Sequence, residues 1–156
     1  MSRVVITGGS GFIGRWLVKK SLEEGHAVTV YDNLCVGRRS NLSEFDGHFE
    51  FVEADIRDED SLAAAMKTAR PEIVFHLAAH HFIPYCNAHP AETMRVNVEG
   101  SEIVARLAAQ AGAERQRAVR GGEPVHVVDL AAGGRTSIVF RTIPGRRRHP
   151  FRRPRR

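Results

Sequence analysis

This chain of 156 residues has few cysteines and no long apolar run. No stretch approaches the roughly eighteen consecutive apolar residues of a membrane helix, and the first residues lack the apolar segment of a signal peptide. Two cysteines, Cys35 and Cys86, are too few for the disulfide framework of a small secreted domain. We therefore expect a cytoplasmic protein that keeps both thiols reduced and has no membrane partner.

The chain is also too short for a cofactor domain plus a separate substrate domain, although it is long enough for one domain with a core. Its formal net charge of +5 is unevenly spread. Residues 1–114 hold 11 Lys and Arg against 16 Asp and Glu, whereas residues 115–156 hold 12 arginines against two acidic residues. We therefore predict a folded domain at 1–113 and a divergent, Arg-rich, partly disordered segment at 114–156.

The predicted domain opens with an apolar run, a glycine loop and a helical pattern. The run Val4–Ile6 is β-branched and uninterrupted, which is typical of a strand buried on both faces of a parallel sheet. Glycines at Gly8, Gly11 and Gly14 would let the backbone turn tightly and approach a pyrophosphate, and the helix that follows would point free N–H groups at the phosphates. The spacing is G-x-x-G-x-x-G rather than G-x-G-x-x-G, so the glycines alone leave an ordinary strand-to-helix turn open.

One acidic residue indicates which dinucleotide is bound. Asp32 follows the apolar run 27–31, about twenty residues after the glycine loop, where an acidic side chain meets the adenosine ribose in dinucleotide-binding folds. A carboxylate there accepts hydrogen bonds from both ribose hydroxyls and repels a 2′-phosphate. The sequence therefore predicts NAD rather than NADP.

Strand and helix patterns alternate along the predicted domain. Strands are expected at 3–7, 27–31, 49–54 and 72–77, and helices at about 12–24, 58–70 and 91–111. Apolar spacing predicts the buried helix faces, which comprise Phe12, Trp16, Leu17 and Leu22, then Leu62, Ala65 and Met66, then Val96, Ile103, Val104, Leu107 and Ala108. Gly112 is expected to end the third helix, and residues 80–90 to form a loop. The alternation predicts an α/β fold with a doubly wound parallel sheet, strand order 3-2-1-4 and a cofactor crevice between strands one and four.

Five short motifs stand at the expected ends of these strands and on the third helix. They are Thr7–Gly14, Asp32–Leu34, Asp55–Asp58, His76–Ala79 and Asn97–Gly100. In this order they closely resemble the extended short-chain dehydrogenase/reductase family, and most of all its NAD-dependent sugar-nucleotide epimerases and dehydratases. The resemblance implies a Rossmann-type fold for residues 1–113, truncated relative to the family.

The resemblance also implies a role for each matched residue. The pyrophosphate would be held by Gly8, Gly11, Phe12, Ile13 and Gly14, the adenosine ribose by Asp32 and Asn33, the adenine by Asp55 and Ile56, and the nicotinamide by Leu77, Ala78 and Ala79. Asn97 would support the site from the long helix, although a merely polar helix residue is the alternative there.

The catalytic pair of the family is missing from this chain. Family enzymes use Tyr-x-x-x-Lys, in which the lysine lowers the pKa of the tyrosine so that it can act as a general base. The two tyrosines here, Tyr31 and Tyr85, are followed at the fourth position by Cys35 and His89. No catalytic residue is therefore predicted.

The sequence leaves the family pattern near residue 113. Residues 114–122 are too charged for the expected fifth strand, and two later stretches, 125–130 and 137–143, could pair as a hairpin across 131–134. We interpret the change as the mark of a frameshifted or truncated gene product. The rival interpretation is a basic C-terminal arm that binds nucleic acid through its arginines.

Histidines gather in the segment after the fourth strand. His76, His80, His81, Cys86 and His89 fall within fourteen residues. Histidine and cysteine can bind zinc, but Cys86-x-x-His89 lacks a second matched pair, so no metal site is predicted. By resemblance this loop faces the substrate, and both a substrate-side role for His81 and simple loop polarity stay open.

For function, the resemblance implies NAD-dependent epimerisation or dehydration of a sugar nucleotide through a keto intermediate. Because the catalytic pair is absent, we expect this chain to bind NAD weakly without turnover. The alternative is a non-catalytic NAD-binding or nucleic-acid-associating protein. Strand four would leave an unpaired apolar edge, which pairing by residues 125–130 or by a second subunit in a homo-oligomer would relieve.

Overall fold

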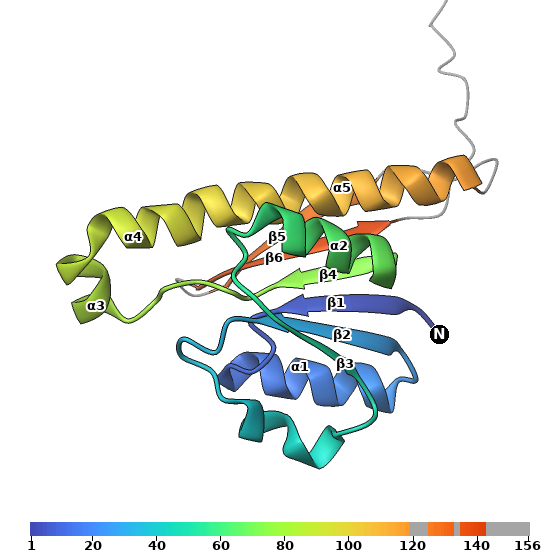
Figure 1. Cartoon of the computed structure of the whole chain (residues 1–156), viewed down its shortest axis with the longest axis horizontal. Helices are drawn as coiled ribbons and strands as arrows, with labels where there is room; N and C mark the ends of the chain where they lie inside the picture. Colours follow the sequence, from blue (N-terminus) through green and yellow to red (C-terminus); the bar gives the residue numbers. More distant parts are fainter. Residues whose placement is uncertain (119–124, 133–134, 143–156) are drawn as a thin grey trace, which may run out of the picture.

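The computed structural model describes residues 1–118, 125–132 and 135–142 of the chain. Figure 1 shows a twisted sheet with helices on both faces. Its parallel part consists of β1 (Arg3–Thr7), β2 (Ala27–Asp32), β3 (Glu50–Glu53) and β4 (Ile73–His76), which pair in the order β3-β2-β1-β4. The predicted α/β fold and strand order are confirmed.

The helices form two layers around this sheet. They are α1 (Phe12–Glu23), the short 3₁₀ helix η1 (Arg39–Phe45), α2 (Glu59–Ala69), α3 (Ile83–Ala88), α4 (Pro90–Met94), the π-helical turn η2 (Arg95–Gly100) and α5 (Ser101–Ala118). One face of the sheet is covered by α1 and η1, and the other by α2 and α5 (Figure 1). None of the described helices combines the length and apolar character needed to cross a membrane.

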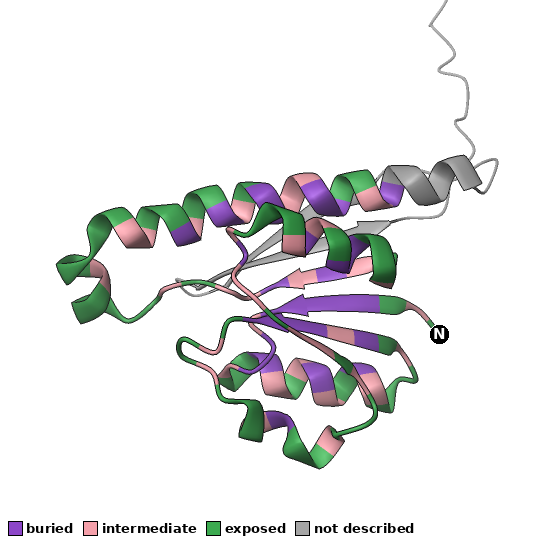
Figure 2. Cartoon of the chain, viewed as in Figure 1, coloured by how far each residue is buried: buried purple, intermediate pink, exposed green. Residues whose placement is uncertain are grey.

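Alternate residues of the central strands supply the two cores. Val4 and Ile6 pack against Val18 of α1 on one face, while Val5 faces the helices on the other. Figure 2 shows β1 and β2 as the most continuously buried strands. Burial on both faces explains why these strands read as uninterrupted apolar runs rather than alternating ones.

The buried face of α1 differs from the prediction. Gly14, Val18 and Ser21 are the buried residues of this helix, whereas Phe12 is 83% and Trp16 52% exposed. Positions 14, 18 and 21 follow the helical repeat and bring the backbone at Gly14 against the glycine loop, which turns Phe12 and Trp16 outward. The predicted inward role of Phe12 and Trp16 is therefore wrong.

The second and third predicted helices bury the faces expected of them. Leu62, Ala65 and Met66 of α2 are buried, and Asp58 caps that helix by accepting a hydrogen bond of 3.1 Å from the Ser61 N–H. The five inward residues predicted for the long helix are also buried, namely Val96, Ile103, Val104, Leu107 and Ala108.

Two boundaries in this part were predicted wrongly. Gly112 does not end the long helix, because α5 continues to Ala118 and a glycine inside a helix costs only about 1 kcal/mol. The expected loop 80–90 contains α3, which is only six residues long and has Pro84 in its first turn, where proline is compatible with a helix.

Beyond α5, two strands extend the sheet. The strands β5 (Val125–Ala132) and β6 (Arg135–Thr142) form an antiparallel hairpin, as predicted, and β6 pairs antiparallel with β4. Residues 125–130, one of the two partners considered for the edge of β4, pair with β6 instead, and β6 supplies the run Ile138–Phe140 that lies beside β4. The arginine-rich end at 143–156, for which disorder or nucleic-acid binding was predicted, lies outside the described residues, as does 119–124.

Candidate functional site

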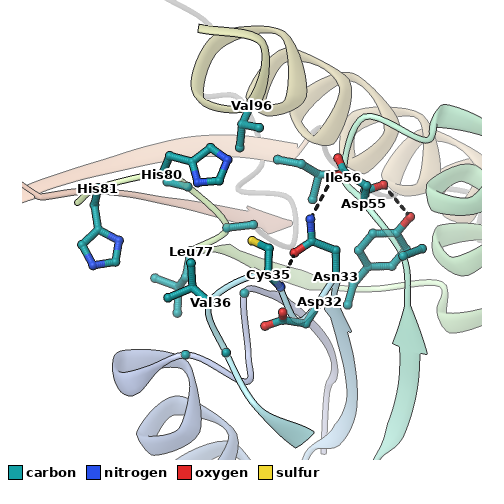
Figure 3. Close-up of a pocket in the computed structure, with 17 residues that line it drawn as sticks. Asp32, Asn33, Cys35, Val36, Asp55, Ile56, Leu77, His80, His81 and Val96 are labelled. Atoms are coloured by element: carbon teal, nitrogen blue, oxygen red, sulfur yellow. Dashed lines mark hydrogen bonds between the residues drawn. The ribbon is translucent and has the colours of Figure 1, made fainter. Parts of the chain in front are cut away.

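A pocket opens where the four parallel strands end (Figure 3). It encloses about 620 Å³ of space, including its open mouth. The carboxyl ends of parallel strands meet at one edge of a sheet, so the loops that follow them converge there. The lining residues come from these loops and from η2: Gly8, Gly11, Tyr31, Asp32, Asn33, Cys35, Val36, Gly37, Ala54, Asp55, Ile56, Leu77, Ala78, Ala79, His80, His81 and Val96.

Most of the predicted cofactor residues line this pocket. These are Gly8, Gly11, Asp32, Asn33, Asp55, Ile56, Leu77, Ala78 and Ala79. The other four, which are Phe12, Ile13, Gly14 and Asn97, do not line it. Phe12 is 83% and Ile13 44% exposed, and Gly14 and Asn97 support the loops from behind. The roles assigned to all thirteen by resemblance stay predictions.

The glycine loop packs so closely against neighbouring backbone that a side chain at Gly8 or Gly14 would not fit. Gly8 has φ +71°, and a Cβ placed there would lie 2.7 Å from the Ala78 nitrogen. At Gly14 an added Cβ would collide with the Gly8 carbonyl oxygen and the Gly9 backbone. The loop leads into α1, which has no side-chain cap and no acidic residue in its first turn. Its N–H groups and positive dipole end are thus available to an anion such as a pyrophosphate.

Asp32 is held rigidly beside this loop. Its side chain is 7% exposed, Oδ2 accepts a 2.9 Å hydrogen bond from the Ser10 N–H, and Oδ1 accepts a 2.8 Å bond from the Leu34 N–H. A carboxylate offers about four acceptor sites, so each oxygen keeps one for a further donor. Leu34 adopts φ +58°, an uncommon conformation that turns the chain sharply after Asp32.

Asp55 lies on the other side of the pocket in a dense polar cluster. Arg57 binds both carboxylate oxygens, with Nε–Oδ1 and Nη2–Oδ2 distances of 2.8 Å, and holds the pKa of Asp55 well below its usual range. Asn33 donates from Nδ2 to Oδ2 at 2.8 Å (Figure 3). Tyr31 donates to the Asp55 carbonyl oxygen at 3.0 Å, and burial raises the pKa of that phenol.

A second network of hydrogen bonds, behind the pocket, joins β1, β4 and α5. The His76 ring is buried, with Nδ1 2.6 Å from Thr7 Oγ1 and Nε2 2.9 Å from Ser101 Oγ. Ser101 Oγ donates to the Asn97 carbonyl oxygen, so we assign the ring proton to Nε2 and an acceptor role to Nδ1. Burial lowers the pKa of His76 to about 4, so the ring is neutral at pH 7.

Asn97 fastens the pocket-lining loop to the long helix. Its Oδ1 accepts from the His80 N–H and its Nδ2 donates to the His80 carbonyl oxygen, both at 2.8 Å. The side chain thus replaces a backbone partner for both groups of His80. His80 follows Ala78 and Ala79 in this loop, and the supporting role of Asn97 for a cofactor stays a prediction.

Some pocket residues were not predicted as site residues. Cys35, Val36 and Gly37 lie in the loop after Asp32, and their only sequence signal was their place after a strand. Burial raises the pKa of the Cys35 thiol, which makes the reactive thiolate less available. Val96 enters from η2, where the π-helical turn displaces the ordinary helical register.

The histidine-rich segment brings three rings into contact. The Tyr85 ring meets the rings of His80 and His89 at centroid distances of 4.9 and 4.6 Å, with the planes tilted by 42° and 41°. Across the described ranges 1–118, 125–132 and 135–142, no group of three or more His, Cys, Asp or Glu side chains is placed to hold a metal ion. His81 lines the pocket, and its substrate-side role stays a prediction.

The comparisons with known proteins agree with the fold and the pocket. Residues 4–122 match the model of the NAD dependent epimerase/dehydratase family. A UDP-glucose 4-epimerase of Mycolicibacterium smegmatis is 40% identical over 115 residues, which are 72% of this chain and 36% of the relative. UDP-glucuronic acid decarboxylase 1 of Danio rerio is 33% identical over 113 residues, or 71% of this chain and 25% of the relative.

Solved structures give the same result. The UDP-glucose 4-epimerase of Thermotoga maritima with UDP-glucose has a TM-score of 0.66 at 36% identity, and that of Thermus thermophilus in complex with NAD has 0.66 at 34%. Each comparison covers 70% of this chain and 34% of the other. The chain thus spans about a third of the length of these relatives. By its matching residues and its fold, as the five motifs predicted, the chain belongs to the NAD-dependent epimerase/dehydratase family.

Proposed function

We propose that this chain binds NAD in the pocket at the carboxyl ends of β1 to β4. The observation that carries the proposal is the Asp32 carboxylate, which the backbone N–H groups of Ser10 and Leu34 hold in place beside the glycine loop. With one acceptor site left on each oxygen, Asp32 can receive the two hydroxyls of a ribose. A 2′-phosphate would place a second negative charge against it, which disfavours NADP.

The other pocket residues fit the rest of the dinucleotide. The uncapped start of α1 and the glycines Gly8 and Gly11, which line the pocket, suit the pyrophosphate. Asp55 and Ile56 would flank the adenine, and the loop 77–79 would line the nicotinamide side. When bound, NAD would supply a hydride acceptor, while the residues of this chain bind and orient it.

Sugar-nucleotide epimerisation or dehydration is the reaction class that the family relation supports. The chain itself has no Tyr-x-x-x-Lys. Tyr31 donates its hydroxyl to the Asp55 carbonyl oxygen, and the Tyr85 ring contacts the imidazoles of His80 and His89. We therefore propose that the chain as given binds NAD without turning over a sugar nucleotide.

Isothermal titration with NAD and NADP tests the cofactor. We expect NAD to bind at least tenfold more tightly than NADP, since a charge-assisted ribose contact would be exchanged for a repulsion. Asp32→Asn should remove most of that difference. Glu53→Gln is the matched control, because Glu53 is an exposed strand-end carboxylate in register with Asp32 but outside the pocket. Equal binding of both dinucleotides by the unchanged protein would contradict the proposal.

A further inference from the structure

We propose that Arg57 is a positioning residue for the nucleobase, acting through Asp55. In this proposal the Asn33 amide donates to the acceptor site on Asp55 that a base amino group would occupy. Arg57 does not line the pocket, whereas Asp55 and Asn33 do. The inference rests on the proposed binding of NAD, whose adenine presents an amino donor. The inference states which hydrogen bond of Asp55 is broken when the base binds. It also states which residue makes the pocket prefer a base with an amino group.

The first step is a count of acceptor sites on Asp55. Oδ1 accepts from the Arg57 backbone N–H at 2.9 Å and from Arg57 Nε at 2.8 Å. Oδ2 accepts from Arg57 Nη2 and from Asn33 Nδ2, both at 2.8 Å. A carboxylate offers about four sites, so this one has none to spare. A new donor can bind Asp55 only by displacing one of these four.

The second step is to ask which of the four bonds can be exchanged. Three come from one residue, and two of those form a bidentate pair between a guanidinium and a carboxylate, which is stronger than a bond from a neutral amide. The Asn33 bond is single and neutral, and its donor lines the pocket (Figure 3). A nucleobase amino group that enters the pocket would therefore replace the Asn33 amide and leave the arginine pair intact.

The third step is that Arg57 is itself fixed from the helical layer. Its Nη1 donates to Glu92 of α4 at 2.6 Å, so the guanidinium bridges two carboxylates. The neighbouring Ile56 packs against Gly100, where a Cβ would lie only 2.6 Å from the Ile56 Cδ1. The turn Asp55–Arg57 is thus held from two directions. This holds Oδ2 within hydrogen-bond distance of Asn33, which lines the pocket.

A merely structural ion pair between the strand loop and α4 would use the same contacts. The two roles differ in one respect that can be measured. A structural role affects every dinucleotide equally, whereas positioning of Asp55 affects only a base that carries an amino donor. Nicotinamide hypoxanthine dinucleotide supplies the comparison, because a carbonyl oxygen replaces the amino group of adenine.

The experiment is titration of the full chain with NAD and with the hypoxanthine dinucleotide. We expect the unchanged protein to prefer NAD by roughly tenfold, the effect of one hydrogen bond to a charged acceptor. In Arg57→Gln the NAD affinity should fall about tenfold and that for the hypoxanthine analogue should change little. Arg57→Lys should keep only part of the preference for NAD. The ammonium still carries the charge, but it cannot form the bidentate pair with Asp55.

Two further variants complete the test. Asn33→Ala removes the competing donor and should raise the preference for NAD. Arg106→Gln is the matched control, because Arg106 also forms a bidentate pair, with Glu59, but on the surface outside the pocket. It should leave the preference unchanged, and circular dichroism of each variant would show that it is folded.

The outcomes separate the inference from the proposed function. If Arg57→Gln weakens both dinucleotides equally, raises the preference for NAD or changes neither affinity, the inference is overturned. If the unchanged protein binds both dinucleotides equally but prefers NAD to NADP, the inference fails and the proposed function stands. If it binds no dinucleotide, both fail.

Discussion

Polar side chains with fixed backbone partners determine the shape of the pocket. Asp32 receives two N–H groups from the loops that follow β1 and β2, and Asn97 pairs with both backbone groups of His80. His76 joins Thr7 of β1 to Ser101 of α5. Asp32 and Asn97 thus satisfy backbone groups that loops leave without a partner in secondary structure, whereas His76 joins two side-chain hydroxyls.

The buried His76 predicts a pH dependence of stability. Burial lowers its pKa to about 4, whereas the unfolded chain titrates near 6.5, so the unfolded state binds more protons between these values. This contribution is complete above about pH 6.5 and is lost as the pH falls toward 4, amounting to roughly 3 kcal/mol at most. Urea unfolding measured from pH 7.5 to 4 should show it.

His76→Gln should flatten this part of the pH profile, because glutamine does not titrate. His48→Gln is the control, since His48 is exposed. Other acidic groups contribute to both profiles, so the difference between variant and parent is the relevant quantity. An unchanged slope in His76→Gln would show that the histidine does not control the effect.

Among single residues, the sequence predicted those with a positional signal. Asp32 was recognisable because an acidic residue follows a strand at a fixed distance from a glycine loop. Arg57 and His76 stood inside recognised motifs, but their partners Glu92 and Ser101 lie 35 and 25 residues away. Contacts at such separations depend on how the helices pack, which no local pattern contains.

At the scale of elements, the irregular helix α4–η2–α5 carries the supporting side chains. The π-helical turn at Arg95–Gly100 holds Val96 toward the pocket and Asn97 toward the loop before α3. Such turns are frequent at functional sites because one extra residue per turn changes the direction of the side chains. Here it lets one helix support both the core and the pocket.

Replacing Asn97 tests this support. Asn97→Ala should cost about 1–3 kcal/mol of unfolding free energy, because the N–H and C=O of His80 lose their partners. It should also weaken NAD binding severalfold through the loop 77–79. Gln110→Ala, on an exposed position of α5, is the control and should change neither. Unaltered stability and affinity in Asn97→Ala would contradict the supporting role.

Element existence was easier to predict than element boundaries or faces. Four strands and three of the helices followed from apolar periodicity, whereas α3 was too short to give a period. The face of α1 was mistaken because Phe12 and Trp16 are apolar by type yet exposed. Trp16 lies beside Arg15 and Lys19, with cation-to-ring distances of 5.3 and 5.5 Å, and this arrangement stabilises an exposed ring.

At the scale of the whole molecule, the hairpin β5–β6 completes one side of the sheet. Without it β4 would be an edge strand with an apolar ladder unpaired. The chain covers about a third of the relatives' length, and its five motifs all fall within residues 4–122, which match the family. Recognition of the family was therefore possible from the sequence, whereas the antiparallel partner of β4 followed from the structure.

Removal of residues 119–156 tests the contribution of the hairpin. The shortened chain should aggregate or self-associate in size-exclusion chromatography, because the edge of β4 becomes available to another chain. A charge placed on the edge of β4 would be expected to prevent such pairing. Phe75→Lys is unsuitable for this purpose, because Phe75 packs against the core. A monodisperse monomer after truncation would show that β4 needs no partner.

The most direct test of the central claim is one calorimetric titration of the full chain with NAD, run beside an assay for turnover of UDP-glucose with the same preparation. The account predicts saturable binding of NAD at one site and no product. Absence of binding would contradict the assignment of the pocket. Turnover would contradict the proposal that the chain as given binds NAD without using it.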